Sequence, residues 1–224
     1  MTAPAILFDL DGTLVDSVPD LAAALNRLLA ARGLAPFARE AVTAMVGDGA
    51  GVLVARAFAA RDAVQDAAAL PEYLADYTAH SAEATRIYPG IEQALAELAQ
   101  GGWRMAVCTN KPAAAAHAVL SALGLDHWFA TVGGGDSFAT RKPDPAHLLA
   151  TLAAAGGDPA RAVMVGDHHN DVASAVAAGV PCIFAAWGYG PREAGAAAAG
   201  IAETASKLPA LLATLRRQFS RSDE

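Results

Sequence analysis

The amino-acid sequence predicts an α/β fold: a Rossmann-like, doubly wound parallel sheet core with an inserted helical domain. Three observations point to this class. Short apolar runs alternate with helical patterns in the later part of the chain, which is typical of a parallel sheet with right-handed crossovers. From residue 16 to residue 85, after the first apolar run, there is no convincing strand. The chain has 224 residues, enough for a core and an insertion.

The expected strands are short apolar runs bounded by Gly, Pro or polar clusters. The first covers residues 5–8, between Pro4 and a cluster of Asp and Gly. Four later runs lie at residues 105–108, 129–132, 162–165 and 182–185. Apolar spacing predicts helices at residues 112–123, 145–155, 171–178 and 208–219.

The long segment after the first strand is expected to form a domain of its own, because a simple crossover needs only about a dozen residues or more. Ser17 followed by Asp20 resembles a capping box at the start of a first helix with an apolar leucine stripe. Further helical patterns cover residues 39–46, 52–60 and 64–79. The predicted division is therefore a core domain of residues 1–15 and 86–224, and a helical domain of residues 16–85.

Composition and charge exclude several classes of protein. The chain is 54% hydrophobic and 17% charged, as expected of a globular protein. Its net charge of -7 argues against a nucleic-acid partner, which would need a basic face. We find no secretory signal and no apolar stretch of the roughly 18 residues that a membrane helix needs, so a cytoplasmic protein without a membrane partner is expected. Cys108 and Cys182 are then expected to be buried thiols rather than a disulfide.

Polar clusters follow the predicted strands, and the carboxyl ends of such strands form the ligand-binding edge of a doubly wound sheet. Asp9 and Asp11 come directly after the first strand, where two like charges repel each other. Proteins tolerate this repulsion at sites where two carboxylates catalyse a reaction or bind a cation. Asp is also an ordinary turn residue, so the pair could simply form a turn at the end of the strand. The side chains expected to meet at this edge are Asp9, Asp11, Thr109, Lys142, Asp167 and Asp171.

Four carboxylates in one crevice would repel one another and would also repel a phosphate. A pair of unit charges ~4 Å apart interacts by about 4 kcal/mol at an effective dielectric of 20, which Lys142 alone cannot offset. A hard divalent cation could, and oxygen ligands favour Mg²⁺ over zinc. The His and Cys residues of the sequence show no zinc-ligand spacing.

Four motifs, in order and after strands, resemble those of the haloacid dehalogenase-like superfamily, and within it the phosphatases of the phosphoglycolate phosphatase type. The segments that carry the resemblance are Phe8-Asp9-Leu10-Asp11-Gly12-Thr13-Leu14, Cys108-Thr109-Asn110, Lys142-Pro143, and Val165-Gly166-Asp167 with Asn170-Asp171. Gly47-Asp48-Gly49 and Tyr88-Pro89-Gly90 are also similar to the phosphatase pattern. The helical insertion lies where this family carries its cap domain.

The resemblance implies a Mg²⁺-dependent phosphatase that hydrolyses a small phosphomonoester, 2-phosphoglycolate first among candidates, through an aspartyl-phosphate intermediate. Asp9 would be the nucleophile. Asp11 would protonate the leaving alcohol and then deprotonate the attacking water. Lys142 would neutralise developing charge and restrain Asp9. Mg²⁺ would bind the Asp9 carboxylate, the Asp11 backbone carbonyl and Asp167.

The resemblance also implies a set of substrate-binding residues. Thr109, otherwise a helix N-cap, and the backbone amide of Asn110 would hold phosphoryl oxygens. Asp171 would position Lys142 or a metal-bound water, or would only cap the helix that follows. Further substrate-binding candidates are Thr13, Gly49 and Arg56. Arg56 is equally a candidate for a solvent-facing helix position.

Other activities and assemblies stay open at this point. A sugar phosphate, an amino-sugar phosphate or pyrophosphate could be the substrate. A phosphomutase of the same fold is disfavoured by Thr13, which that branch tends to lack, and a dehalogenase would need neither Asp11 nor Mg²⁺. A binding protein that reuses the fold without catalysis is a further alternative. The adjacent His168 and His169 depart from the family pattern. They are expected either to face solvent or to bind a softer metal. The protein is expected to be a monomer or a homodimer.

Overall fold

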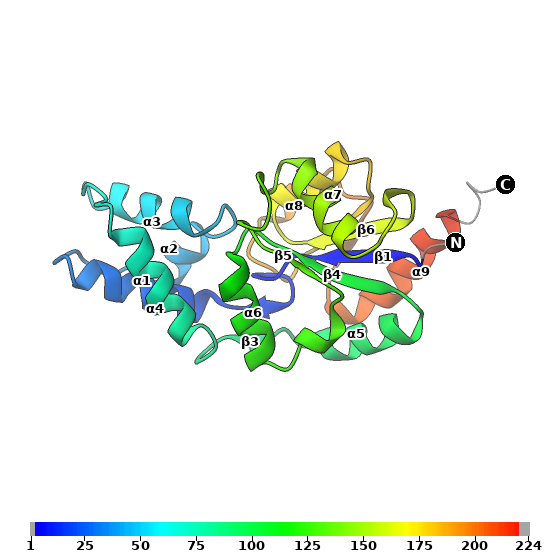
Figure 1. Ribbon diagram of the computed structural model, residues 1–224, viewed down its shortest axis with the longest axis horizontal. Helices are drawn as coiled ribbons and strands as arrows, with labels where there is room; N and C mark the ends of the chain where they lie inside the picture. The colour runs from blue at the N-terminus through cyan, green and yellow to red at the C-terminus, as the bar shows by residue number, and fades with distance from the viewer. Residues whose placement is uncertain (1–2, 220–224) are drawn as a thin grey trace.

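A six-stranded parallel sheet forms the centre of the larger part of the molecule (Figure 1). The computed structural model describes residues 3–219, so the ends of the predicted core domain lie outside the described residues. The strands are β1 (Ala5–Phe8), β4 (Arg104–Cys108), β5 (Val132–Gly133), β6 (Ala162–Gly166), β7 (Cys182–Ala185) and β8 (Gly200–Ala202). Their order is β5-β4-β1-β6-β7-β8. The chain thus builds outward from β1 in both directions, which places the switch point of the sheet beside β1.

Helices cover both faces of this sheet, as a doubly wound fold requires. One face packs against α5 (Ile91–Gln100), α6 (Ala113–Ala122) and α9 (Leu208–Phe219), and the other against α7 (Pro145–Ala154) and α8 (His169–Ala177). The four residues of β1 divide alternately between the two cores, Ile6 and Phe8 on one side, Ala5 and Leu7 on the other. A strand buried on both faces is a continuous apolar run, which is why the sequence predicts β1 and β7 with their correct bounds.

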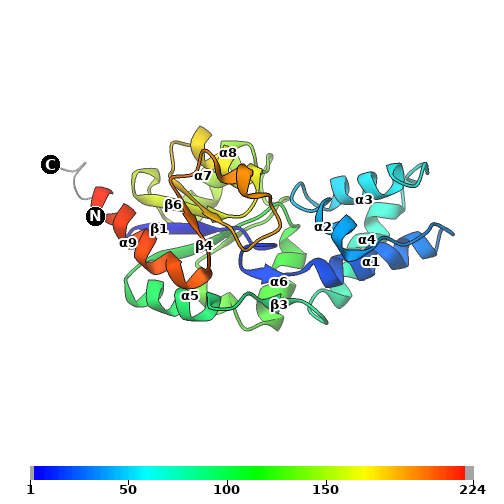
Figure 2. The same cartoon turned by 180° about the vertical axis from the view of Figure 1, so that it is seen from behind.

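The inserted segment forms a helical domain with its own apolar core, at the left in Figure 1. Its helices are α1 (Val18–Ala30), α2 (Arg39–Thr43), α3 (Ala50–Ala59) and α4 (Ala69–His80). Two strands that the sequence did not predict, β2 (Val15–Asp16) and β3 (Arg86–Ile87), pair antiparallel where the chain enters and leaves this domain. Figure 2 shows this linker from behind, with α5 and α9 packed together along the neighbouring edge of the core. The helical domain is called the cap below.

The expected capping box at the start of α1 is wrong. The Ser17 side chain makes no cap hydrogen bond and instead donates to Asp11 Oδ1 at 2.6 Å. The Asp20 carboxylate accepts hydrogen bonds from the backbone nitrogens of Ala84 and Thr85, the shortest at 2.7 Å. Both side chains therefore serve the junction of cap and core, where contacts between distant segments override the local helix-end pattern.

Element bounds differ elsewhere from the predicted ones. The third apolar run is shorter as a strand than expected, because β5 begins only at Val132 and Phe129 closes a turn while packing on the core. The sequence did not predict the glycine-containing β8, nor α5, although Ile91, Leu95 and Leu98 recur at helical spacing. Short 3₁₀ helices lie at Asp126–Trp128, Pro159–Arg161, Arg192–Gly195 and Ala205–Lys207.

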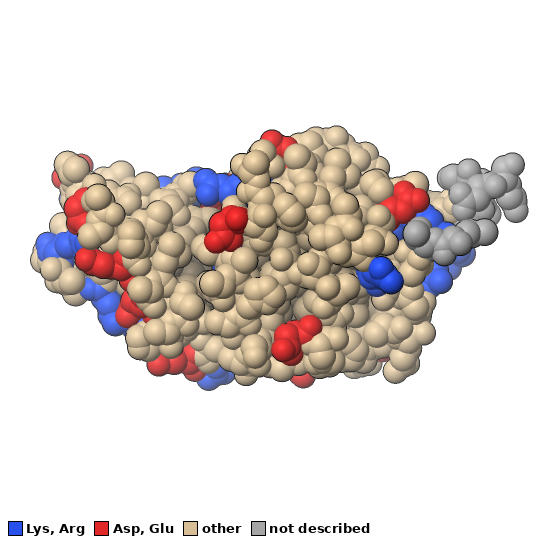
Figure 3. All heavy atoms as spheres, in the orientation of Figure 1, with Lys and Arg blue, Asp and Glu red and all other residues tan. Residues whose placement is uncertain are grey.

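Three further expectations can be compared with the structure. Cys108 and Cys182 are buried free thiols, as predicted. Between residues 3 and 219, no helix combines the length and the apolar character needed to cross a membrane. On the face drawn in Figure 3, the described Lys and Arg side chains are scattered rather than gathered into one broad basic surface.

Candidate active site

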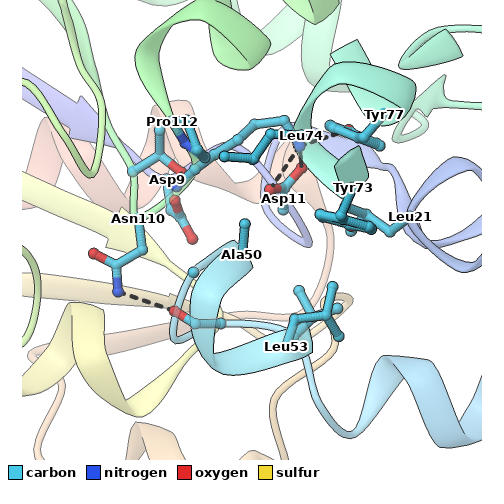
Figure 4. A pocket seen from close by; sticks show the side chains of 15 residues that line it. Asp9, Asp11, Leu21, Ala50, Leu53, Tyr73, Leu74, Tyr77, Asn110 and Pro112 are labelled. Atoms are coloured by element: carbon cyan, nitrogen blue, oxygen red, sulfur yellow. Dashed lines mark hydrogen bonds and ion pairs between the residues drawn. The ribbon is translucent and has the colours of Figure 1, made fainter. Parts of the chain in front are cut away.

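The predicted site residues meet at the carboxyl edge of the sheet, under the cap. Asp9 directly follows β1, Thr109 follows β4, and Asp167 follows β6. A cavity that is partly open to solvent lies between this edge and cap helices α3 and α4 (Figure 4). Its walls combine polar core residues with apolar cap residues such as Leu53 and Leu74. The core thus supplies the charged groups and the cap covers them.

Asp9 is held beside a buried lysine but keeps one carboxylate oxygen without a hydrogen bond. Lys142 Nζ lies 3.0 Å from Asp9 Oδ1 as an ion pair. The hydrogen bonds of Lys142 go instead to the Cys108 carbonyl and to Asp171 Oδ1, both at 2.6 Å. Asp9 Oδ1 is buried and has no hydrogen-bond donor. The Lys142 ammonium therefore compensates the charge of this buried oxygen, and no hydrogen bond restrains it.

Three buried carboxylates gather here, since oxygens of Asp9, Asp167 and Asp171 lie within 4.8 Å of one another. Burial raises the pKa of Asp9 to about 6, although Lys142 opposes the shift and Asp171 and Asp11 add to it. Burial, together with the charges of Asp9 and Asp171, raises the pKa of Asp167 to about 8. The protein alone therefore does not neutralise this cluster, and its all-oxygen donor set fits a hard cation.

Asp167 is fixed by neighbours on both sides. Its Oδ1 accepts a hydrogen bond from the Thr13 hydroxyl at 2.7 Å, and its Oδ2 accepts one from the Tyr189 backbone nitrogen at 2.8 Å. Gly12 lies against the same carboxylate, with a φ of +86°, and a Cβ there would lie 2.3 Å from Asp167 Oδ2. Gly12 therefore meets two demands, a left-handed backbone and close approach of a carboxylate. Thr13 is completely buried on Asp167 and does not line the cavity.

Asp11 lines the cavity but takes no part in the carboxylate cluster. Lys111 Nζ contacts both of its oxygens, at 2.9 and 3.0 Å, and Ser17 donates to Oδ1. Lys111 Nζ also donates to the hydroxyl of Tyr77, on cap helix α4, at 2.6 Å. Asp11 is thus held at the boundary of core and cap, on the same side of the cavity as Asp9 (Figure 4).

The other predicted substrate-binding residues have different surroundings. Thr109, Asn110 and Gly49 line the cavity. The Asn110 side chain donates to the Gly47 carbonyl at 3.0 Å and so ties the cap loop to the core. The structure does not bring Arg56 to the cavity. Its half-exposed guanidinium pairs with Asp48 at 2.6 Å and donates to the Met45 carbonyl, so it supports the cap loop instead.

Asp171 contacts both groups between which the sequence left a choice, the Lys142 ammonium and the first turn of α8. Its Oδ1 accepts from Lys142, and its Oδ2 accepts from the His168 backbone nitrogen at 2.9 Å, within a capping box for α8. His168 completes that box by accepting from the Asn170 nitrogen. His168 is half-buried, since Gly47 of the cap lies against its ring, whereas His169 is exposed. With Asp48, the two imidazoles form a second group whose ligand atoms could hold a metal ion.

Sequence reasoning missed Lys111, Tyr77, Tyr73, Ser17 and Tyr189. Two signals pointed to Lys111: it directly follows the second motif, and it is one of only three lysines in the chain. The tyrosines carried no signal, because an aromatic residue at helical spacing is usually a core residue. Tyr189 donates its hydroxyl to Asp16 Oδ1 at 3.0 Å and accepts from the Ser17 nitrogen at 2.7 Å. Tyr189 therefore stabilises the linker between cap and core through hydrogen bonds to two of its residues.

Comparison with known proteins finds extensive similarity. A family model described as haloacid dehalogenase-like hydrolase matches residues 6–185. A phosphoglycolate phosphatase from Rhodospirillum rubrum is 48% identical over 193 residues, which cover 83% of this chain and 80% of the relative. Another from Agrobacterium fabrum is 44% identical over 191 residues, covering 84% and 82%.

Solved structures resemble the whole fold, cap included. The crystal structure of a predicted phosphoglycolate phosphatase from Haemophilus somnus 129PT matches with a TM-score of 0.87 and 30% identity, covering 94% of this chain and 99% of that one. CbbY from Rhodobacter sphaeroides, in complex with phosphate, matches with a TM-score of 0.79 and 27% identity, covering 92% and 96%. The arrangement of sheet, cap and linker is therefore shared with these proteins.

Proposed function

The chain belongs to the haloacid dehalogenase-like hydrolase family and is a phosphoric monoester hydrolase, and from this premise we propose that it hydrolyses 2-phosphoglycolate with Mg²⁺. One observation carries the proposal: Asp9 lies at the switch point of the sheet, faces the cavity, and keeps a buried oxygen without a hydrogen bond. The names of the most similar relatives support the choice of ester.

In the proposed reaction an oxygen of Asp9 attacks phosphorus, and the bond from phosphorus to the ester oxygen breaks. Asp11 gives its proton to that leaving oxygen, so that glycolate departs. Asp11 then takes a proton from water, which attacks the aspartyl phosphate and releases inorganic phosphate and free Asp9. Ser17 and Lys111 hold the Asp11 carboxylate at the cavity wall for both proton transfers. Lys142, 3.0 Å from Asp9, offsets the charge of the transferring phosphoryl group.

Mg²⁺ would be held by the carboxylates of Asp9 and Asp167 and by the Asp11 backbone carbonyl. When bound, it would supply positive charge between the nucleophile and the phosphate. The residues present fit this ion, because the cluster offers only oxygens, and burial together with the neighbouring carboxylates raises the pKa values of Asp9 and Asp167. Asp171 belongs to the cluster, but its two oxygens are engaged by Lys142 and the His168 nitrogen. We therefore assign it to positioning Lys142.

Thr109 and Asn110 would bind the phosphoryl oxygens at the end of β4. Both line the cavity next to Asp9, and Asn110 is anchored by its side chain to Gly47 and to the Lys142 carbonyl. With the side chain fixed in this way, the backbone amide of Asn110 has a defined position. Thr13, buried on Asp167, would act on the metal ligand and not on the substrate.

The substrate proposal is tested by phosphate release from purified protein with Mg²⁺. The panel contains 2-phosphoglycolate, a pentose phosphate, an amino-sugar phosphate, a hexose phosphate and pyrophosphate. We expect kcat/KM for 2-phosphoglycolate to be at least ~10-fold above the others, a preference that one or two good polar contacts can supply. A different preferred ester would overturn the substrate, and conversion of a hexose phosphate without phosphate release would indicate a mutase.

We also propose that the protein works in the cytoplasm, an assignment supported by two buried free thiols. Fractionation of cells with an antibody against the chain tests the location. Light scattering distinguishes the predicted monomer from the homodimer.

A further inference from the structure

One wall of the cavity carries a positive charge in addition to the one that Lys142 holds beside Asp9. Lys111 is 5% exposed, and it is the only basic side chain among the described residues that line the cavity. Its ammonium contacts Asp11 from the core and Tyr77 from the cap. Lys142, the other lysine near the site, lies behind Asp9 and does not line the cavity. Lys111 is therefore placed to meet the part of a substrate that lies beyond the phosphate.

Two phenol groups lie next to this ammonium on cap helix α4. Tyr73 and Tyr77 are one helical turn apart, with stacked rings whose centroids are 6.1 Å apart and inclined by 9°. The Tyr77 hydroxyl accepts a hydrogen bond from Lys111, which leaves its own proton for another acceptor. The Tyr73 hydroxyl is buried and has no hydrogen-bond partner. Burial raises the pKa of both phenols, so both keep the proton that they could donate.

A buried hydroxyl without a partner is rare in folded proteins, because its desolvation is not compensated. Tyr73 lines the cavity, so an acceptor on a bound molecule can supply the missing bond. The remaining cap wall is apolar, formed by side chains such as Leu21, Leu53 and Leu74. The polar contacts that the cap wall offers are thus concentrated at Tyr73 and Tyr77, beside Lys111.

The chemistry of these three groups selects an anion. An ammonium with two neutral O–H donors matches a carboxylate, which accepts several hydrogen bonds and carries the compensating charge. Asp11 is the counter-ion of Lys111 in the structure, and in the proposed reaction its oxygen must turn to the ester oxygen of the substrate. A carboxylate one carbon from that ester oxygen would lie close to Asp11 and so close to Lys111.

We infer that Lys111, Tyr77 and Tyr73 form a subsite for a carboxylate on the carbon next to the ester oxygen, and that this subsite selects 2-phosphoglycolate over neutral esters of the same size. The identity of the ester rests on the proposed function. Because Lys111 belongs to the core and both tyrosines belong to the cap, the selection requires the two domains to be in contact.

Binding to an inactive protein tests the subsite separately from turnover. The probes are 2-phosphoglycolate and 2-hydroxyethyl phosphate, which replaces the carboxylate by a neutral CH₂OH group. Calorimetry with Mg²⁺ measures both affinities in Asp9→Asn protein, alone and combined with Lys111→Met. We expect Lys111→Met to weaken the binding of 2-phosphoglycolate ~10- to 100-fold, as for loss of a charge-assisted contact. The affinity for the neutral ester should change less than about 3-fold.

Two variants complete the design. Lys207→Met is the matched control, because Lys207 is an exposed lysine in the 3₁₀ helix near α9, and both affinities should stay unchanged. Tyr73→Phe removes only the unpartnered hydroxyl, and it should weaken 2-phosphoglycolate several-fold without affecting the neutral ester. Since Tyr73→Phe keeps the ring and its packing, it decides the question even where Lys111→Met fails to fold.

The inference is overturned if Lys111→Met weakens both esters equally, since Lys111 would then act only by positioning Asp11. It is also overturned if the Asp9→Asn protein binds both esters with the same affinity. Hydrolysis by the unmodified protein is scored separately. Its failure on 2-phosphoglycolate would refute the proposed function, while the two affinities would still decide the carboxylate subsite.

Discussion

Two buried lysines lie near the cavity, and they differ in whether one domain or both domains contact them. Lys142 is enclosed by the core alone and contacts Asp9, Asp171 and the Cys108 carbonyl. Lys111 bridges the domains, with Asp11 on one side and Tyr77 of the cap on the other. Groups that act on the phosphoryl centre are thus fixed within one rigid sheet. In the proposed subsite, the groups that meet the rest of the substrate are shared between core and cap.

The pKa of Lys142 illustrates how firmly the core holds it. Burial by itself would lower the pKa of this ammonium, but the charges of Asp171 and Asp9 outweigh burial and raise it above its usual value. Lys142 is therefore held in its charged form at neutral pH. Tyr77, in contrast, offers Lys111 a neutral hydroxyl from a different domain.

The largest effect is expected for Lys142→Met. Loss of this ammonium leaves Asp9 and Asp171 buried without their cation, so stability should fall by about 3–5 kcal/mol, as for breaking a buried ion pair. Activity should fall at least ~1000-fold on charged and neutral esters alike. Denaturant melts and phosphate release measure the two effects.

The contrast with Lys111 makes that experiment decisive. Lys111→Met should discriminate between the esters, whereas Lys142→Met should not. If Lys142→Met spared the neutral ester, the division of labour between the two lysines would be wrong.

Metal removal should have a pH-dependent effect on stability. The folded pKa of Asp167, about 8, lies above its ordinary value of 3.8, so the metal-free folded protein binds an extra proton between these values. Its contribution to stability is therefore present at low pH and is lost as the pH rises towards 8. Mg²⁺ replaces that proton as the compensating charge, so it should stabilise the protein more at pH 8.5 than at pH 5.5.

The measurement is the Tm with Mg²⁺ and with EDTA at both pH values. We expect the gain from saturating Mg²⁺ to be at least ~5 °C greater at pH 8.5, since 1 kcal/mol shifts the Tm of a domain of this size by about 2–4 °C. Asp167→Asn, which removes the titrating group, should abolish most of the difference. An equal gain at both pH values would argue against a cation at this cluster.

A smaller effect is expected at the linker between the domains. Asp20→Asn keeps the shape of a buried side chain but removes the charge that accepts bonds from two backbone nitrogens and the Thr85 hydroxyl. Stability should fall by about 1–3 kcal/mol. KM for 2-phosphoglycolate should rise more than kcat falls, because Asp20 orients the cap and not the core. Melting curves and initial rates test this, and an unchanged KM with reduced kcat would contradict it.

The smallest effect is expected for Arg56→Ala. Arg56 is paired with Asp48 outside the cavity, and a half-exposed ion pair contributes at most about 1 kcal/mol. kcat/KM for 2-phosphoglycolate should therefore change less than about 5-fold. A loss approaching that of Lys111→Met would show that Arg56 turns into the cavity when the substrate binds.

The sequence determined the sheet core and much of its catalytic edge. Strands buried on both faces must be apolar throughout, so β1, β4, β6 and β7 were recognisable from local composition. The polar groups that end them were recognisable for the same reason, because a charge directly after a buried strand lies at the sheet edge. Asp9, Thr109 and Asp167 follow this rule. Lys142 was found through its motif.

Only the tertiary structure decided which polar groups from distant segments meet. Lys111 and Asp11 are 100 residues apart, and Lys111 and Tyr77 are 34 apart, on elements whose docking no local pattern encodes. The same docking directs Ser17 to Asp11 in place of the expected helix cap and leaves Arg56 outside the cavity. The buried positions can be predicted from the local sequence, because each residue's burial depends on its own position in a strand or helix. The hydrogen-bond partner of a polar side chain depends on where a distant segment packs. The position of that segment is determined only by the packing of the cap against the core.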